Sequence, residues 1–443
     1  MRARKLARPV LIWTICAWLC LALAACFGNG DKSEPRPGQP PSTNNGTGSV
    51  VDGASPEEEG EGAGEDAGQG GGASEDDGNA RIEELIEAMS PAEKLGQLVM
   101  IGVEGEHLDE TVTRLIEQHH VGGVILYGRN LLDTSQAAAL INGLKEANAS
   151  GIAPLFIGID EEGGRVTRLP AELTPTPASR VIGSRDDPDW TYEVGELIGE
   201  KLASFGINVN FAPVLDIDSN PDNPVIGDRA FGTDTEAVSA HGIAAMEGMA
   251  RHVVPVVKHF PGHGDTHEDS HTDLPVVSHD AARLRGFELQ PFERAIKSGA
   301  DAVMVAHLLV PAYDERYPAS LSKPIITELL RKELGFEGVV FTDDMTMGAI
   351  ADHYEYADAI VRAVLAGADQ ILIGHGYDHA ETAMTALEDA FLSGVLTEER
   401  LDESVRRVLR LKMKYGLRDE PVGPIDVGAL NEKAELVLGE QGR

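Results

Sequence analysis

The 443-residue chain is strongly acidic: 73 Asp and Glu side chains oppose 37 Lys and Arg, which leaves a formal net charge of −36. A charge of this size argues against nucleic-acid binding and against a basic membrane-binding face. The stretch from residue 80 onward is long enough for one large single domain, so we expect one folded unit preceded by other segments.

The N-terminus has the pattern of an export signal. Four basic residues among the first eight precede an apolar stretch, residues 10–23, that is short for a membrane-spanning helix. The following Leu23-Ala24-Ala25-Cys26 resembles the lipobox of bacterial lipoproteins, in which cleavage leaves Cys26 as a lipidated N-terminus. The other two cysteines lie inside the signal peptide, 1–25, so we expect no internal disulfide. The sequence predicts an extracytoplasmic protein that is anchored to the bacterial cell membrane through Cys26 only. The alternative is a retained N-terminal anchor helix.

Residues 26–79 have the composition of a linker. Gly, Ser, Pro, Asp and Glu dominate there, and hydrophobic side chains are almost absent. Such a segment cannot bury enough apolar surface to offset the entropy lost on ordering, so we expect a flexible acidic tether. The predicted domain follows at 80–418, and a tail at 419–443 is expected to pack on it or trail from it.

Strand-like and helical patterns alternate from residue 80 onward. Ser90-Pro91-Ala92-Glu93 is a capping box with proline at the first helical position, which predicts a helix start. Eight β-α alternations in one sheet predict an α/β fold with a single (β/α)8 barrel of the TIM type. The main rival, an open doubly wound sheet, lacks a Gly-rich dinucleotide fingerprint after an early strand. The expected strands are residues 97–103, 121–127, 154–160, 208–214, 253–259, 302–308, 338–343 and 369–374.

Polar side chains gather where these predicted strands end. Functional side chains of such a barrel lie at the C-terminal ends of the strands, so the sequence predicts that these residues share one rim. The residues at or just past strand ends are Asp160, Asp216, Lys258, His259, His307, Asp343 and His375.

The stretch 258–271, Lys-His-Phe-Pro-Gly-His-Gly-Asp-Thr-His-Glu-Asp-Ser-His, follows a β-branched run that is typical of a buried strand. Pro261, Gly262 and Gly264 forbid a helix there, so the titratable side chains must lie on a loop. Loops carried by a rigid scaffold are where binding and catalytic residues are usually placed. We therefore expect chemistry on this loop.

The strand that ends in Asp343-Asp344 carries two adjacent carboxylates. Successive strand residues point to opposite sides, so only one of the two can face the barrel mouth. A carboxylate across from the His/Asp loop is the arrangement of a retaining glycosidase, in which a covalent glycosyl-enzyme forms on the carboxylate. The alternative, above all for Asp344, is a helix cap or an ion pair.

Two segments carry a specific resemblance. Leu329-Leu330-Arg331-Lys332-Glu333, with the later Gly-Val-Val-Phe-Thr-Asp run and Thr346, resembles the active-site signature of glycoside hydrolase family 3, which implies that Asp343 is the nucleophile. The 258–271 stretch is similar to the corresponding segment of the β-N-acetylglucosaminidases of that family, the NagZ-like branch. The resemblance, which runs from about residue 85 to 417, implies that His271 is the general acid/base and that Asp269 completes a dyad with it.

The same resemblance implies a set of sugar-binding residues. Carboxylates accept hydrogen bonds from adjacent sugar hydroxyls, while guanidinium groups donate in a fixed fork. For each arginine the alternative is a structural ion pair, and Asp216 is either a ligand or an organiser of the basic residues. The implied substrate-binding residues are Asp160, Arg168, Asp216, Arg229, Lys258 and His259.

The resemblance implies a retaining exo-β-N-acetylglucosaminidase. It would remove terminal N-acetylglucosamine from cell-wall muropeptides or related oligosaccharides, without a metal or other cofactor, and we expect a monomer. Histidine suits the acid/base role because its ordinary pKa lies near neutrality.

Several alternatives remain open. Histidines at 259, 263, 267 and 271 have the four-residue spacing of a helical metal site, but the loop should not be helical. Family 3 β-glucosidases and xylosidases usually take their acid/base from a second αβα domain, for which we expect no room, and some Gram-positive members of the NagZ-like branch carry a further C-terminal domain. Phosphorolysis of the glycoside, as in an N-acetylglucosamine phosphorylase, is a further alternative. A lipid-anchored sugar-binding protein without catalysis would place the chain in a different functional class.

Overall fold

The computed structural model describes residues 75–270 and 273–439. The predicted signal peptide, Cys26, nearly all of the predicted linker and His271 lie outside the described residues. The first described helix, α1 (Glu75–Ala88), begins within the predicted linker, a few residues before the expected domain start at 80. Across the described residues, no helix is both long and apolar enough to cross a membrane.

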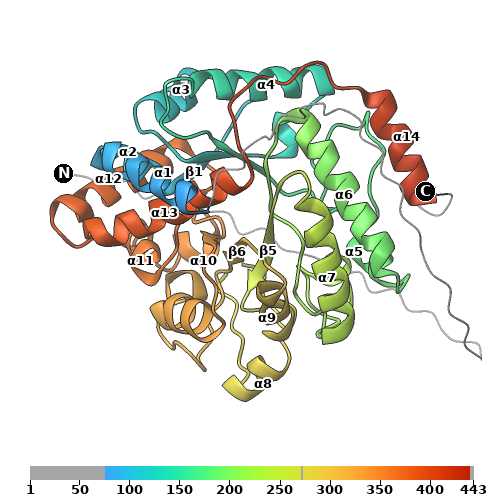
Figure 1. The fold of residues 1–443 in the computed structure, drawn as a ribbon. Coiled ribbons are helices and arrows are strands. Elements are labelled where there is room, and N and C mark those ends of the chain that lie inside the picture. Colours follow the sequence, from blue (N-terminus) through green and yellow to red (C-terminus); the bar gives the residue numbers. More distant parts are fainter. Residues whose placement is uncertain (1–74, 271–272, 440–443) are drawn as a thin grey trace, which may run out of the picture. The chain divides into compact units, whose positions relative to one another are not determined.

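Eight parallel strands form the centre of the fold (Figure 1). Neighbours pair in the order β7-β6-β5-β4-β3-β2-β1-β8, and a parallel bridge between Phe341 and Gln370 joins the two end strands into a closed barrel. Each strand overlaps its predicted segment, which confirms the (β/α)8 prediction. The strands are β1 (Val99–Gly102), β2 (Gly123–Leu126), β3 (Phe156–Ile159), β4 (Val209–Asn210), β5 (Val254–Phe260), β6 (Ala302–Val305), β7 (Val339–Thr342) and β8 (Ile371–Ile373).

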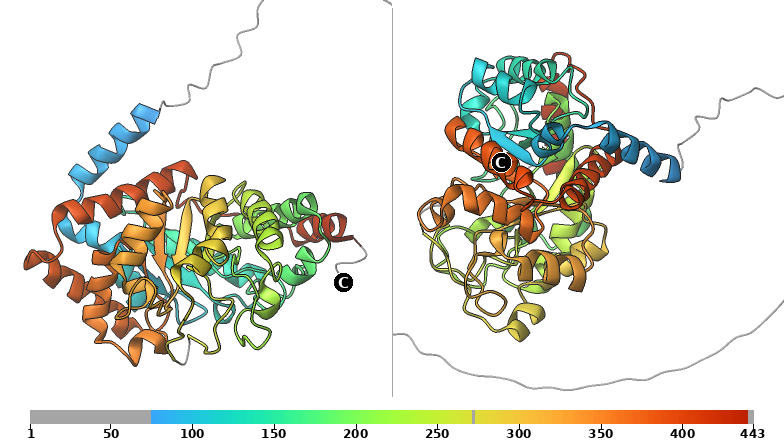
Figure 2. Two further views of the ribbon diagram at one scale, coloured as in Figure 1. Left: turned by 90° about the horizontal axis from the view of Figure 1, so that it is seen from below. Right: turned by 90° about the vertical axis from the view of Figure 1, so that its left-hand side faces the viewer.

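Helices surround the barrel on the outside (Figures 1 and 2). The predicted capping box is present: the Ser90 hydroxyl accepts from Glu93 N, and the Glu93 carboxylate accepts from Ser90 N at 2.8 Å. Aspartate side chains accept hydrogen bonds at the N-termini of several other helices, which accounts for some of the many acidic residues of the chain. The larger helices are α2 (Pro91–Gly96), α3 (Glu110–Glu117), α4 (Thr134–Ala147), α6 (Pro188–Phe205), α7 (Thr235–Met249), α9 (Gln290–Lys297), α11 (Tyr356–Ala366), α12 (Tyr377–Leu392), α13 (Glu398–Lys414) and α14 (Val427–Leu438).

Shorter helical segments lie in the connections. They are α5 (Ser179–Gly183), α8 (Ala281–Gly286), α10 (Gly348–Ala351), the 3-10 turns η1 (Gly128–Asn130), η2 (Gly227–Arg229) and η3 (Ala319–Leu321), and the π-helix η4 (Pro324–Glu333). The last helix, α14, packs against α6, where Trp190 Nε1 donates to Val437 O at 2.7 Å. This part of the predicted C-terminal tail therefore packs on the barrel.

Two apolar layers stabilise the barrel. One lies between strands and helices, and the other fills the barrel interior, where Phe211 and Phe156 meet Phe341 with ring centroids 5.5 and 6.0 Å apart. Because both faces of each strand are buried, the strands appear in the sequence as continuous apolar runs. The inner layer also supplies the floor of the pocket described next, through Ile125, Met304 and Leu372.

Candidate active site

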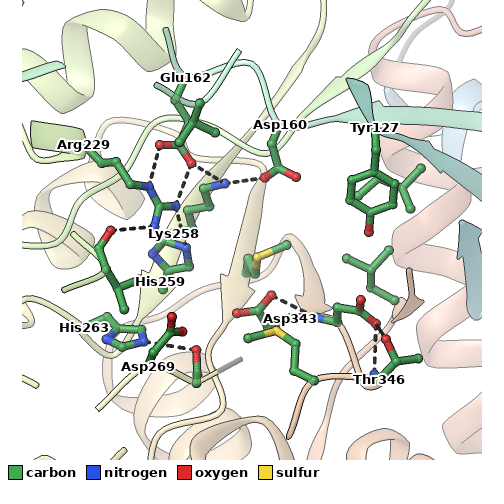
Figure 3. A pocket seen from close by; sticks show the side chains of 18 of the residues that line it. Tyr127, Asp160, Glu162, Arg229, Lys258, His259, His263, Asp269, Asp343 and Thr346 are labelled. Carbon is green, nitrogen blue, oxygen red and sulfur yellow. Dashed lines mark hydrogen bonds and ion pairs between the residues drawn. The ribbon is translucent and has the colours of Figure 1, made fainter. Parts of the chain in front are cut away.

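A pocket of about 490 Å³ opens at the C-terminal ends of the strands (Figure 3). This volume is in the range of small-molecule sites. Most of the predicted site residues line it, although they are widely separated in sequence. The predicted residues that line the pocket are Asp160, Arg168, Arg229, Lys258, His259, Asp269 and Asp343.

Glu162 is the centre of a buried charge network on one side of the pocket (Figure 3). Its carboxylate accepts from Arg229 Nε and Nη2 at 2.8 and 2.7 Å, and Lys258 Nζ lies 2.8 Å from Oε1. Burial opposes ionisation of Glu162, but the charges of Lys258 and Arg229 outweigh it and hold the pKa of Glu162 well below its ordinary value. The carboxylate therefore stays ionised. The sequence analysis did not single out Glu162.

Lys258 joins this network to the predicted ligand Asp160. Its ammonium group donates to Asp160 Oδ1 at 2.5 Å and its side chain is 2% exposed, whereas that of Asp160 is 20% exposed. Burial alone would lower the pKa of Lys258, but the carboxylates of Asp160 and Glu162 raise it by more than burial lowers it. The net shift is upward, so the group stays charged. Asp160 thus has one oxygen anchored while its side chain still faces the pocket.

Asp216 and Arg229 hold the His259 ring in one orientation. Its Nδ1 lies 2.6 Å from Asp216 Oδ2, and Arg229 Nη2 lies 3.3 Å from its Nε2. The carboxylate at Nδ1 therefore fixes the orientation of the ring. Asp216 itself is fully buried, does not line the pocket, and also accepts from His263 N at 2.7 Å. Of the two roles considered for Asp216, this position favours the organiser.

His263 stands behind Asp269 as a neutral group. Its Nδ1 lies 2.8 Å from Thr266 Oγ1, and its Nε2 lies 3.3 Å from Ser270 Oγ. Burial, and then the nearby charge of His259, lower the pKa of His263 to about 4. This histidine is therefore neutral near pH 7 and ties two parts of the loop together.

Both adjacent carboxylates after β7 line the pocket, so the prediction that only one of them faces the barrel mouth is wrong, but the two differ in what they bind. Asp343 lines the pocket, and its Oδ1 accepts from Asp344 N at 2.9 Å. Asp344 Oδ1 accepts three hydrogen bonds, from Thr346 N, Thr346 Oγ1 and Gly374 N, at 2.8 to 2.9 Å. The carboxylate of Asp344 therefore holds the turn after the strand, and its Oδ2 lies 3.7 Å from His375 Nε2, so its contacts are structural although it does not cap a helix.

The loop after β5 is not helical, as the sequence predicted. Gly262 has φ of +126°, and a Cβ at Gly264 would lie 1.7 Å from Ile217 O, so only glycine fits at the second position. Asp269 and Ser270 of this loop line the pocket across from Glu162. His271, the predicted acid/base that follows them in sequence, lies outside the described residues.

Arg168 is positioned by the loop after β3. Buried Glu161 accepts from Thr167 Oγ1 at 2.6 Å and from Arg168 N at 2.7 Å, which fixes the backbone that carries the guanidinium group. In the described part of the chain, no carboxylate forms an ion pair with the Arg168 side chain. Arg229, by contrast, forms the bidentate pair with Glu162, which is the ion-pair alternative considered for it. Among the described residues, no group of three or more His, Cys, Asp or Glu is arranged to hold a metal ion.

Comparison with known proteins agrees with this geometry. Residues 91–411 match the model of the glycosyl hydrolase family 3 N-terminal domain. A β-hexosaminidase A of Pseudoalteromonas piscicida is 38% identical over 332 residues, which cover 69% of this chain and 56% of that protein. The chain thus spans just over half the length of that relative. The β-hexosaminidase LpqI of Mycobacterium tuberculosis is 35% identical over 333 residues, covering 73% of this chain and 83% of that protein.

A solved structure gives the same result. The family 3 β-N-acetylglucosaminidase of Paenibacillus sp. str. FPU-7 superposes with a TM-score of 0.76 at 43% identity, covering 79% of this chain and 68% of that one. The family model covers well over half of the sequence, and it includes the barrel strands and all the described site residues. The chain therefore belongs to glycosyl hydrolase family 3.

Proposed function

We propose that the protein is a retaining exo-β-N-acetylglucosaminidase. The single observation that carries the proposal is Asp343, which extends from the end of β7 into the pocket that also holds Asp160, Lys258 and Asp269. A carboxylate nucleophile, fixed partners for sugar hydroxyls and a His/Asp loop are the parts that a retaining glycosidase requires. The β-hexosaminidase and β-N-acetylglucosaminidase names of the relatives support the choice of sugar.

The reaction has two steps. In the first, the Asp343 carboxylate attacks the anomeric carbon while the glycosidic oxygen leaves with a proton from His271, and a glycosyl ester forms on Asp343. In the second, His271 takes a proton from water, the water oxygen attacks the anomeric carbon, and the carboxylate is released. Asp269 orients the imidazole. No cofactor takes part.

The charge network holds the sugar in place for both steps. Asp160 accepts from sugar hydroxyls, His259 and Arg168 contact the same ring, and Asp216 keeps His259 in a single orientation. Because Glu162 fixes Lys258 and Arg229 before substrate arrives, little ordering is left to be done on binding.

The location and natural substrate belong to the same proposal. The lipobox-like sequence at Cys26 supports anchoring outside the cytoplasm, where cell-wall muropeptides are the accessible substrates. The acidic linker would give the barrel reach from the membrane.

The test compares nitrophenyl β-N-acetylglucosaminide with nitrophenyl β-glucoside, using the purified protein and two variants, Asp343→Asn and His271→Ala. We expect cleavage of the N-acetyl substrate alone. The kcat should fall by at least about 10³-fold in Asp343→Asn and less strongly in His271→Ala, because nitrophenol needs little acid assistance. Asp301→Asn is the matched control, since Asp301 lies at the opposite end of the barrel and pairs with Lys414. Proton NMR of the first-formed sugar should show the β anomer.

Several outcomes contradict parts of this proposal. Full activity in Asp343→Asn removes the nucleophile assignment, and an α anomer removes retention. If the glucoside is cleaved at an equal rate, the assignment of N-acetylglucosamine as the sugar is wrong. Turnover that depends on added phosphate indicates a phosphorylase, and sugar binding without any turnover indicates a binding protein.

A further inference from the structure

Tyr127 lies just past the end of β2 and places a hydroxyl group in the pocket that none of the assigned roles uses. The side chain lines the pocket on the side away from Arg229 and His259, with its hydroxyl end directed inward (Figure 3). Within residues 75–270 and 273–439, no protein group forms a hydrogen bond with this hydroxyl. The hydroxyl is not among the enclosed, unpartnered polar atoms of the described residues, so it is open to the pocket, where a ligand or water can bind it.

The ring that carries the hydroxyl is held by its neighbours. It stacks on His375 with centroids 5.0 Å apart and an interplanar angle of 18°, and Arg129 Cζ lies 4.5 Å from its centroid. The backbone is fixed as well, since Tyr127 N donates to Asn130 Oδ1 at 2.8 Å, and Asn130 in turn donates to Val103 O and Gly105 O. The hydroxyl position is therefore set before any ligand binds.

Gly374 makes this position possible. A Cβ at Gly374 would lie 2.1 Å from the Tyr127 hydroxyl oxygen and 2.4 Å from Asp344 Oδ2. Any larger residue would displace one of the two groups. The absence of a side chain just past β8 thus lets the phenol lie close to the Asp344 carboxylate.

The surroundings keep the phenol protonated. Burial, and then the carboxylates of Asp344, Asp160 and Asp343, raise the pKa of Tyr127 far above its ordinary value. Near neutral pH the group is therefore a neutral hydrogen-bond donor that faces acidic groups, and it can donate to a hydroxyl oxygen of a ligand lying among them.

We propose that Tyr127 is a further substrate-binding residue, whose hydroxyl donates a hydrogen bond to one hydroxyl group of the terminal sugar. The inference rests on the proposed function, because it takes the ligand of the pocket to be a sugar. It adds a contact from β2, opposite the contacts from β3 and β5, so that the ring is held from two sides.

The first test measures binding without catalysis. Calorimetric titration of free N-acetylglucosamine into the wild-type protein and Tyr127→Phe should show a Kd about five- to tenfold higher for the variant, the effect of one neutral hydrogen bond. Phenylalanine keeps the ring stacked on His375, so the fold should be unchanged. Tyr356→Phe is the matched control. Tyr356 also packs against a histidine ring, that of His379, and its hydroxyl also has no partner in the described residues, but it lies outside the pocket.

The second test identifies the sugar hydroxyl. The 3-, 4- and 6-deoxy analogues of N-acetylglucosamine are titrated in the same way, and one of them should bind wild type and Tyr127→Phe equally, because the partner hydroxyl is missing. Equal weakening on all analogues, or no weakening on N-acetylglucosamine, overturns the inference.

The same variants in the nitrophenyl assay separate the two proposals. Binding that depends on Tyr127 in a protein that hydrolyses nothing refutes the proposed function and keeps the sugar contact. Hydrolysis that is lost in Asp343→Asn but unchanged in Tyr127→Phe, with unchanged binding, refutes only the contact.

Discussion

The two ends of the barrel both contain buried ion networks, but the two networks differ in whether their polar groups face the active-site pocket. At the N-terminal end, Asp369 accepts from Ser404 Oγ and Arg407 Nη1 with one oxygen, and from Arg331 Nη2 and Val340 N with the other. At the C-terminal end, Asp160 shares one oxygen with Lys258 while its side chain remains 20% exposed. A fully buried carboxylate with both oxygens paired, such as Asp369, ties elements together, whereas a partly exposed one, such as Asp160, can exchange partners with a ligand.

The difference follows from how the barrel ends are closed. Helix α13 covers the N-terminal end, which is the closed end of the barrel. It inserts Lys412 into this end, where Nζ donates to Gln97 Oε1 at 2.8 Å and to Gly122 O at 3.0 Å. At the other end the long loops after β3 and β5 surround the pocket. The signature arginine Arg331 therefore serves the closed end, although its segment helped to identify the family.

The largest expected effect comes from breaking the closed network. Three arginines, Arg331, Arg400 and Arg407, share the Asp369 carboxylate. Asp369→Ala would remove this shared partner, and we expect the free energy of unfolding to fall by about 3–5 kcal/mol. Urea denaturation measures the loss. The fraction that remains folded should keep the wild-type KM, because no group at this end contacts the pocket.

A raised KM in folded Asp369→Ala would contradict the division between the ends. Asp301→Asn at the same end is the control, because Asp301 forms a partly exposed pair with Lys414 and should cost far less stability.

At the open end, Glu162→Gln should affect activity more than stability. The amide keeps the shape but removes the charge that fixes Lys258 and Arg229, so we expect kcat/KM to fall by about 10²-fold with a loss of stability of about 2 kcal/mol. Steady-state kinetics and urea denaturation measure the two effects. Glu333→Gln, which breaks a bidentate pair with Arg285 away from the pocket, is the control. A loss of activity only in proportion to unfolded protein would assign Glu162 a purely structural role.

The acidic triplet Asp160-Glu161-Glu162 shows where prediction from the sequence ended. Asp160 could be placed because it ends an apolar strand. Strand alternation did not separate Asp343 from Asp344, because both lie past the end of β7 and both line the pocket. Past the strand no such periodicity exists: Glu161 binds backbone of its own loop, whereas Glu162 binds cations far along the chain. Tyr127 was missed because an aromatic residue after an apolar strand resembles core.

The pH dependence of the free energy of unfolding should reveal Lys412, the buried lysine at the closed end of the barrel. Burial lowers the pKa of Lys412 from 10.5 to about 7, and Asp419 offsets this only in part. Between about pH 7 and pH 10 the unfolded chain binds a proton that the folded chain lacks, so this group makes stability rise with pH in that window. From pH 7 to pH 9 the wild type should gain about 2 kcal/mol relative to Lys412→Met. Urea denaturation at both pH values measures this difference, with Lys414→Met as the exposed control.

If the free energy of unfolding depended on pH in the same way in wild type and Lys412→Met, the lysine would stay charged in the folded protein. The nitrophenyl assay adds a second readout, since Lys412→Met should keep the wild-type KM if the closed end of the barrel does not affect the pocket.

The smallest effect is expected at the exposed edge of the open end. Arg165 lines the pocket, but its guanidinium group already pairs with Asp228 and donates to Val225 O and Ile226 O, and the two paired side chains are about half exposed. Such pairs contribute at most about 1 kcal/mol and are screened by salt. Arg165→Gln should therefore lower stability by less than about 1 kcal/mol and change KM less than threefold. Kinetics at low and high salt test this, with Arg168→Gln as the comparison expected to raise KM more. If Arg165→Gln matched Arg168→Gln in KM, ligand binding would extend beyond the buried network, and saturation of hydrogen bonds would not by itself separate structural from binding residues at this end of the barrel.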